Sequence, residues 1–280
     1  MNVNSLSKTP TIKDWLTNAT HQLSVASIPS ARLDAEIILA DTLCNDRTYL
    51  HTHPEQIIST NQQKTADVKL KSRLKRMPIA YIIGHKEFYG RDFKVTPATL
   101  IPRPESETII DILKQILPST NLLDVGTGTG CLGITAKLEF PNLDVTLTDI
   151  SPDALSIATF NANALLADVA TLQSDLLHNY PSKPDIIIAN LPYVDKNWDR
   201  SPETDYEPKL ALFADNNGKS IIEELITQAS NLLLPGGYII IEADPAQHDA
   251  LTEFAIKQSF TPAHQLGYVI AFRYQHSQHC

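Results

Sequence analysis

Hydrophobic residues follow a helical spacing in the first part of the chain and strand-like runs further on. Up to about residue 75, apolar side chains recur every three or four positions, which is typical of helices that bury one face. The recurring positions are Trp15, Ala19 and Leu23, then Leu33, Ile37, Ala40 and Leu43. Ser30 is expected to be the N-cap of the second helix, and a third helix is predicted over residues 61–76. We therefore expect a small helical bundle, whose basic third helix presents a solvated face.

The pattern changes between residues 77 and 104. Tyr81-Ile82-Ile83 and Phe93-Lys94-Val95 are rich in β-branched and aromatic residues, and Gly84 and Gly90 fall between them. These runs predict a β-hairpin-like connector. A helix is predicted to follow it on the apolar positions Ile109, Ile110, Leu113, Ile116 and Leu117.

Strand and helix patterns then alternate. Short apolar runs predict strands at residues 122–125, 145–148, 169–172, 185–189 and 238–241. Helical patterns between them predict helices at residues 131–139, 152–167 and 219–234, with Ser151 as the N-cap of the second. This order predicts an α/β fold, with a doubly wound, mainly parallel sheet and helices on both faces.

Charge and composition narrow the function classes. The 280-residue chain has a net charge of −9 and a pI near 5.4, which argues against a protein that binds naked nucleic acid through a basic surface. Its three cysteines (Cys44, Cys131 and Cys280) are far apart and odd in number, so we expect no disulfide framework. The N-terminus lacks an apolar core flanked by basic residues, and no apolar run approaches about 18 residues. We therefore expect a soluble, cytoplasmic protein that does not bind a membrane.

A glycine-rich loop, D124-V-G-T-G-T-G-C-L-G133, follows the first predicted strand of the sheet. Glycines let the backbone approach a ligand closely, and the next helix offers unpaired N–H groups. Asp149 ends the following strand, where a carboxylate can accept both hydroxyls of a ribose. We predict a nucleotide-like cofactor at Asp149 and at the loop residues Gly126, Thr127, Gly128, Thr129 and Gly130. Because residues 128–133 also fit the G-x-G-x-x-G pattern, spacing alone leaves an NAD-type cofactor open.

Several segments together resemble a known enzyme family. The glycine loop with T148-D149-I-S-P is similar to the cofactor motifs of S-adenosylmethionine-dependent methyltransferases. The segments PIAYIIGHKEFYGRDFKVTPATLIPRPESE, NLPY and EPKLAL resemble the family that methylates the glutamine side chain of bacterial peptide chain release factors. The resemblance implies a Rossmann-like fold with a helical substrate-recognition domain (1–75), a β-hairpin connector (76–103) and a methyltransferase domain (104–280).

The same resemblance implies what the protein binds. S-adenosylmethionine would be the methyl donor, and the substrate would be the glutamine in the Gly-Gly-Gln loop of a release factor. We expect a monomer that makes no direct contact with nucleic acid. In methyltransferases of this class, the residues matching Asp175 and Leu176 hold the adenine amino group and pack on the adenine ring, although Asp175 could instead cap a helix.

Asn190, Leu191, Pro192 and Tyr193 are the residues to which the resemblance assigns catalysis, and Asn190 is also expected to contact the cofactor. A glutamine amide nitrogen is a poor nucleophile because its lone pair is delocalised, so a site must hold and aim it. Its two N–H groups need two acceptors, and the resemblance implies the side-chain oxygen of Asn190 and the carbonyl of Leu191. Tyr193 would offer a flat apolar wall to the planar amide.

Leu191 departs from the family pattern, which is Asn-Pro-Pro-Tyr. Pro192 still biases residue 191 towards an extended backbone, so we expect catalysis to survive. Asn-Leu-Pro-Tyr is also similar to the motif of ribosomal RNA adenine dimethylases, so an rRNA adenine N6-methyltransferase is one alternative. A non-catalytic cofactor-binding interaction protein is another. The acidic pI and the segments LIPRPESE and EPKLAL favour glutamine methylation.

Other polar residues have simpler interpretations. Arg103 and Glu107 either line the substrate entrance or form a surface pair. Asn161 is expected to be structural, and Cys131 to pack rather than to react. The histidines lack further ligands at metal-binding spacing, so no metal is expected.

Overall fold

The computed structural model describes residues 9–116, 120–178 and 180–275, and the chain forms two compact units. The first unit consists of the chain up to Gly84 together with Pro202–Tyr206, and the second of His85–Ser201 together with the chain from Glu207. Leu117 and Cys280, which the sequence analysis named, lie outside the described residues. Within the described residues, no helix is both long and apolar enough to cross a membrane.

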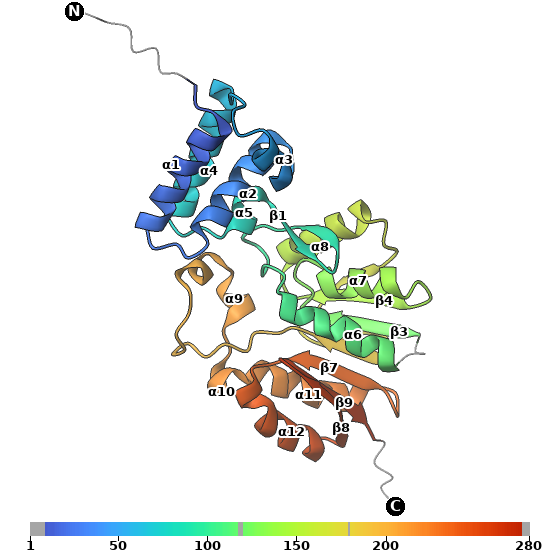
Figure 1. Ribbon diagram of the computed structural model, residues 1–280. Helices are drawn as coiled ribbons and strands as arrows, with labels where there is room; N and C mark the ends of the chain where they lie inside the picture. The colour runs from blue at the N-terminus through green and yellow to red at the C-terminus, as the bar shows by residue number, and fades with distance from the viewer. Residues whose placement is uncertain (1–8, 117–119, 179, 276–280) are drawn as a thin grey trace, which may run out of the picture. The chain divides into compact units, whose positions relative to one another are not determined.

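The first unit is helical, as predicted (Figure 1). Its helices are α1 (Ile12–Val25), α2 (Ala31–Leu43), α3 (Arg47–Thr52), α4 (Thr60–Leu74) and α5 (Ile79–Ile83), and a 3₁₀ turn, η2 (Pro202–Tyr206), joins them. Trp15, Ala19 and Leu23 are buried along α1, which confirms the predicted face of that helix. Helix α1 begins with a capping box, in which the Thr11 hydroxyl and the Asp14 carboxylate each accept a backbone N–H of the other residue.

The predicted buried face of α2 is confirmed at Ala40 and Leu43, which are buried, and wrong at Leu33. Leu33 is 42% exposed, whereas Asp34 and Ala35 are buried. The carboxylate of Asp34 can be buried because Nε of Arg73 donates to it at 2.6 Å, and the attraction between the two charges offsets much of the cost of desolvating them. Ser30 stands at the N-cap position, but its hydroxyl donates to Asp34 and accepts no backbone N–H.

Residues 81–83 form part of a helix and not of a strand, so that prediction is also wrong. They belong to α5, a single turn that starts after Pro78 and ends at Gly84, whose φ of 83° is left-handed. The β-hairpin begins only after this glycine, with β1 (His85–Phe88) and β2 (Arg91–Lys94) paired antiparallel. A run of β-formers as short as this one is decided by its tertiary surroundings more than by its propensity.

The second unit is built on a seven-stranded sheet. Its strands are β3 (Asn121–Val125), β4 (Asp144–Asp149), β5 (Ala170–Gln173), β6 (Ile186–Ala189), β7 (Tyr238–Glu242), β8 (Phe260–Leu266) and β9 (Val269–Tyr274). They lie in the order β5-β4-β3-β6-β7-β9-β8, and the first five are parallel. This confirms the doubly wound, mainly parallel sheet. The antiparallel strands β8 and β9 were not predicted; β8 contains Pro262 at a register shift and is mostly exposed, so it lacks a regular apolar alternation.

Helices cover both faces of this sheet. The longer ones are α6 (Glu107–Ile116), α7 (Cys131–Glu139), α8 (Pro152–Ala164), α11 (Ser220–Leu232) and α12 (His248–Lys257). The shorter ones are η1 (Pro104–Ser106), α9 (Lys209–Leu212), α10 (Asp215–Gly218) and η3 (Pro245–Gln247). Helices α6, α7 and α8 share one buried cluster with Ile186 and Ile188 of β6, and α11 and α12 share another with Ile187 and Ala189. Successive residues of a strand face opposite sides, so an unbroken apolar run is what a doubly covered strand requires.

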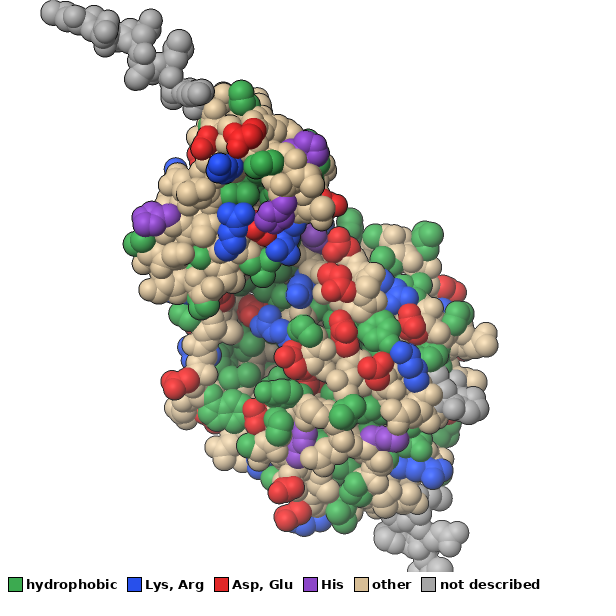
Figure 2. Space-filling view, viewed as in Figure 1, with side chains coloured by type: hydrophobic (Ala, Val, Ile, Leu, Met, Phe, Trp, Pro, Cys, Tyr) green, Lys and Arg blue, Asp and Glu red, His purple; other side chains and the backbone are tan. Residues whose placement is uncertain are grey.

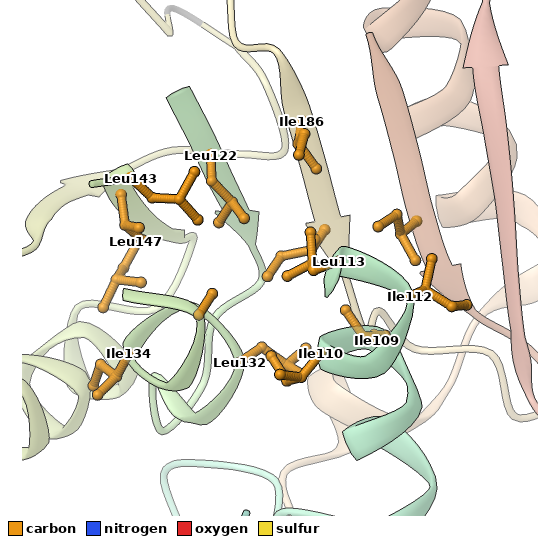
Figure 3. Close-up of a cluster of buried hydrophobic side chains, with 14 of the residues drawn as sticks. Ile109, Ile110, Ile112, Leu113, Leu122, Leu132, Ile134, Leu143, Leu147 and Ile186 are labelled. Atoms are coloured by element: carbon orange, nitrogen blue, oxygen red, sulfur yellow. The ribbon is translucent and has the colours of Figure 1, made fainter. Parts of the chain in front are cut away.

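Figure 3 shows the first of these clusters, in which Ile109 and Leu113 of α6 point towards the sheet residues Leu122 and Ile186. All four side chains are at most 1% exposed. This packing holds α6 against the face of the sheet at β3 and β6, and η1 immediately precedes this helix.

Candidate functional site

A cavity of about 220 Å³ lies at the carboxyl ends of the parallel strands, in the second unit. The strand order reverses between β3 and β6, and ligands of open α/β sheets bind at such a reversal. Eight of the predicted site residues line the cavity: Gly126, Gly128, Asp149, Asp175, Leu176, Asn190, Leu191 and Pro192. Thr127, Thr129, Gly130 and Tyr193 do not line it, although they belong to the same loops.

The glycine loop takes a shape that only glycine adopts readily. Gly126, Gly128 and Gly130 all have left-handed φ values, between 55° and 81°. A Cβ added to Gly128 would meet no atom within 4 Å, so open space adjoins its backbone at the cavity. Thr127 has a supporting role instead: its hydroxyl donates to Asp124 at 2.6 Å.

The buried carboxylate of Asp124 holds the glycine loop through hydrogen bonds to Thr127 and Gly133. One of its carboxylate oxygens accepts from the Thr127 hydroxyl and from the backbone N–H of Gly133, at 2.9 Å. Its other oxygen, Oδ1, is buried and makes no hydrogen bond among the described residues. Burial raises the pKa of this carboxyl to about 6. The residue opens the predicted loop motif, but the sequence did not indicate that it acts by holding the loop.

Asp149 is held by the loop that it faces. Its Oδ2 accepts from the backbone N–H of Gly128 at 2.9 Å, and its Oδ1 accepts from the N–H of Ser151 at 2.9 Å. Burial raises the pKa of this carboxyl from its ordinary value. The carboxylate is therefore fixed at the cavity wall, where it could accept hydroxyl groups of a ligand.

Asp175 and Leu176 come from the end of β5. The Leu176 side chain is buried, with a left-handed φ of 47°, and it lines the cavity together with Ile150. Asp175 is exposed, and a turn rather than a helix follows it over residues 175–178. Apolar walls beside an exposed carboxylate suit a flat heterocycle that carries an amino group.

Asn190 is oriented by hydrogen bonds on the side away from the cavity. Its Nδ2 donates to Oγ of Ser106 at 2.9 Å, and that hydroxyl donates to Oε2 of Glu242 at 2.5 Å. Oε1 of Glu242 accepts from the Tyr193 hydroxyl at 3.0 Å. Burial raises the pKa of Glu242, and burial beside Glu242 raises the pKa of Tyr193.

Sequence reasoning missed both Ser106 and Glu242 as site residues. Ser106 is a small polar residue at a helix start, where an N-cap is the ordinary explanation. Glu242 carried a usable signal, because it is a carboxylate at the end of the apolar strand β7, one strand away from Asn190. A buried carboxylate there requires partners.

Two further segments that line the cavity are joined through Glu207. This carboxylate accepts from the backbone N–H of Ile101 at 3.1 Å and from Arg103 at 2.5 Å. The neighbouring residues 98–100, Pro208, Leu210 and Ala211 contribute to the cavity lining. The segments LIPRPESE and EPKLAL, far apart in sequence, are thus joined by a charged pair of which Glu207 is only 5% exposed.

Arg103 and Glu107 do not pair with one another. Arg103 binds Glu207, and Glu107 accepts the backbone N–H of Tyr89 at 2.9 Å in the hairpin turn. Neither residue lines the cavity. Both act within the framework of the second unit.

Backbone contacts fix the peptide that follows Asn190. The Tyr193 carbonyl accepts from Nε2 of Gln247 at 2.9 Å, and Nε2 also donates to the carbonyl of Asn217. A Cβ on Gly218 would lie only 1.9 Å from the Tyr193 carbonyl oxygen, so only glycine fits there. Asn216 and Asn217 hold left-handed φ values of 56° and 53°, which asparagine tolerates better than most residues.

Asn161 is structural, as predicted. Its Oδ1 accepts from the N–H of Lys94, and its Nδ2 donates to the carbonyls of Lys94 and Thr129. It ties β2 to the glycine loop. Cys131 packs against the apolar cluster, and burial raises the pKa of its thiol to about 12. Within the described ranges, no group of three His, Cys, Asp or Glu side chains could hold a metal ion.

The chain matches two family models: the PrmC N-terminal domain over residues 14–84 and the methyltransferase small domain over residues 104–203. A release factor glutamine methyltransferase from Koribacter versatilis is 40% identical over 257 residues, with 87% of this chain and 91% of the relative covered. One from Salmonella typhimurium is 36% identical, with 85% and 87% covered.

Among solved structures, a methyltransferase from Pyrococcus furiosus matches with a TM-score of 0.53 and 20% identity, covering 78% of this chain and all of that one. At that identity the likeness shows the fold alone. The Rossmann-like methyltransferase fold expected from the sequence is thereby confirmed.

Proposed function

The chain belongs to the family of release factor glutamine methyltransferases, and we propose that it transfers a methyl group from S-adenosylmethionine to the side-chain nitrogen of a release factor glutamine. The matches to the relatives at 40% and 36% identity cover 91% and 87% of those proteins and 87% and 85% of this chain, so the proposal concerns both units. The substrate glutamine is that of the Gly-Gly-Gln loop. The observation that carries the proposal is the placement of Asn190 in one cavity with the glycine loop and Asp149.

The cavity residues fit S-adenosylmethionine. Gly128 leaves open space beside its backbone, so a ligand can approach the loop closely. Asp149 is positioned to hold ribose hydroxyls, and Leu176 with Ile150 provides apolar surface for the adenine, whose amino group would bind Asp175. When bound there, the cofactor supplies a methyl group on a positively charged sulfur.

Asn190 holds the reacting nitrogen. Its Nδ2 is engaged by Ser106, and its Oδ1 makes no hydrogen bond to the described residues around it. Oδ1 is therefore available to accept one N–H of the glutamine amide, and the carbonyl of Leu191 accepts the other. Two acceptors fix the plane of the amide and the direction of its nitrogen. This precise orientation compensates for the weak nucleophilicity of the amide nitrogen. Tyr193, held through its hydroxyl by Glu242, would stand beside the planar amide.

Leu191 is compatible with this role. Its side chain is only 6% exposed and packs in a buried apolar cluster. Every residue has a backbone carbonyl, so leucine in place of proline leaves this acceptor unchanged. We propose that substrate alignment uses the backbone at this position and that the side chain serves packing.

The first unit would recognise the release factor outside the Gly-Gly-Gln loop, and the enzyme would act as a cytoplasmic monomer without binding nucleic acid. An rRNA substrate fits the protein less well. The net charge is −9, and Figure 2 shows acidic side chains interspersed with basic ones over the face in view, whereas RNA affinity relies on concentrated positive charge.

The test is methyl transfer from labelled S-adenosylmethionine to three substrates in parallel: a release factor, the same factor with its Gly-Gly-Gln glutamine replaced by alanine, and ribosomal RNA. We expect label on the first only, with weak dependence on salt. Asn190→Ala should lower kcat by about 100-fold or more, whereas Asn163→Ala, an exposed asparagine of α8, should not. Label on RNA, or on the factor without its glutamine, would refute the proposal.

A further inference from the structure

Glu242, Ser106 and Asn190 form a chain of hydrogen bonds that ends at the cavity. The three residues come from the end of β7, from η1 and from the end of β6, and Glu242 and Ser106 are 1% and 2% exposed. The two bonds measure 2.5 Å and 2.9 Å. Neither Ser106 nor Glu242 lines the cavity, so an effect on the substrate passes through Asn190 or, for Glu242, also through Tyr193.

The direction of each bond follows from the donors available. An ionised carboxylate can only accept, and a serine hydroxyl has a single proton to donate. The Ser106 hydroxyl donates its one proton in the hydrogen bond to Glu242, so Oγ has only lone pairs left for a further hydrogen bond. Oγ can therefore accept from the Nδ2 of Asn190 but cannot donate to its Oδ1.

This directionality distinguishes the two ends of the asparagine amide, which are otherwise nearly equal in size and shape. With Nδ2 bound to Ser106, Oδ1 is the end left for a ligand in the cavity. If the amide turned by half a rotation, Nδ2 would face the glutamine NH₂, and two groups of donors would oppose each other. Asn190 would then repel the atom that it must hold.

We propose that Glu242, acting through Ser106, is a positioning residue that fixes the orientation of the Asn190 amide and so presents an acceptor to the substrate. The Tyr193 hydroxyl adds a second donor to the same carboxylate, so one buried group orients both side chains of the substrate motif. The inference rests on the proposed function for its catalytic consequence, whereas the amide orientation itself can be observed without catalysis.

The variants Ser106→Ala and Ser106→Thr separate orientation from folding. Alanine removes the link, whereas threonine keeps a hydroxyl with the same donor and acceptor capacity. We expect Ser106→Ala to lower kcat by about 10- to 100-fold with little change in the KM for the release factor, and Ser106→Thr to stay within about threefold of the wild type. Thr135→Val is the matched control, because Thr135 is a buried threonine of α7 whose hydroxyl has no partner among the described residues.

A double-mutant cycle tests whether Ser106 works through Asn190. In an Asn190→Ala background, Ser106→Ala should change kcat less than about twofold, since no amide remains to be oriented. A purely structural role would lower the rate by the same factor in both backgrounds. Equal factors, or a Ser106→Ala enzyme as fast as the wild type, would overturn the inference.

The orientation of the Asn190 amide can also be measured without catalysis, so this test is distinct from the test of methyl transfer. In protein labelled with ¹⁵N at asparagine side chains, the Asn190 NH₂ signals should shift and broaden in Ser106→Ala and return close to their wild-type positions in Ser106→Thr. Unchanged signals in Ser106→Ala would refute the positioning role even if the enzyme methylates release factors. Shifted signals in an enzyme that fails to methylate them would instead count against the proposed function alone.

Discussion

A methyl group of Leu191 occupies the space next to Gly126: a Cβ added to this glycine would lie 2.6 Å from Leu191 Cδ2. The residue that departs from the family pattern thus packs directly against the loop proposed to hold the cofactor. Gly126 also has a left-handed φ of 68°, so a side chain there would be strained as well as crowded.

Gly126→Ala should therefore weaken binding of S-adenosylmethionine and lower the free energy of unfolding. Adding Leu191→Ala removes the crowding but not the strained φ, so it should restore part of the loss. We expect a coupling energy of about 1 kcal/mol or more between the two changes, from urea unfolding of the two single variants and the double variant. Simple additivity would show that the close contact has no energetic consequence.

Asp149→Ala should raise the dissociation constant of S-adenosylmethionine by about 10- to 100-fold. The carboxylate would contribute acceptors to the ligand, and it also holds the N–H groups of Gly128 and Ser151 in place. Calorimetric titration measures the constant. Asp144→Asn, at an exposed residue on the same strand β4, is the control. Equal affinity of Asp149→Ala and the wild type would exclude Asp149 from the binding site.

Asp124 should make the protein less stable as the pH rises. The pKa of its buried carboxyl is about 6 in the folded chain, against about 3.9 for a solvated aspartate. Between these values the folded state binds more protons than the unfolded state. The stabilising contribution is therefore complete below about pH 4 and is lost as the pH rises through about 6.

The measurement is the free energy of unfolding of wild type and Asp124→Asn from pH 4 to 7. The wild type should lose roughly 2 kcal/mol relative to the variant over this range. Parallel profiles would mean that Asp124 titrates normally in the folded state.

Arg73→Ala should destabilise the first unit by about 3 to 5 kcal/mol, because it leaves the buried Asp34 without its charged partner. Arg73 is 5% exposed and also binds Glu203 at 2.9 Å. Thermal unfolding measures the loss. The double variant Arg73→Met with Asp34→Leu should recover much of it, because replacing both ions by apolar groups removes the desolvation penalty as well as the attraction. A double variant as unstable as Arg73→Ala would contradict this account.

The sequence was sufficient to predict the features that rest on local patterns. The strands that end near Gly126, Asp149 and Asn190 are short runs of strand-forming residues, and parallel strands bring their carboxyl ends to one edge of the sheet. Those three residues could therefore be expected to share a cavity, and they do. Strand β8 has no such pattern, because it lies at an edge and is interrupted by Pro262.

Interactions between distant polar residues could not be predicted in this way. Ser106 and Glu242 are 136 positions apart, and nothing in either neighbourhood specifies the other as a partner. The burial of Asp34 on α2 has a similar origin, since Arg73 reaches this carboxylate from another helix. Periodicity assumes that charged residues stay in solvent, and it fails where a charged partner from elsewhere in the fold makes their burial tolerable.

Asn161 has a practical consequence for anyone who wishes to express the catalytic half by itself. Its amide spans from β2 to the carbonyl of Thr129, so the hairpin at residues 85–94 braces the glycine loop from outside the sheet. A fragment that starts at residue 104 would retain all strands of the seven-stranded sheet but would lack the hairpin that Asn161 links to the glycine loop. A fragment starting at or before His85 keeps it, and is the shorter chain to choose for crystallisation, ligand screening or isotope labelling.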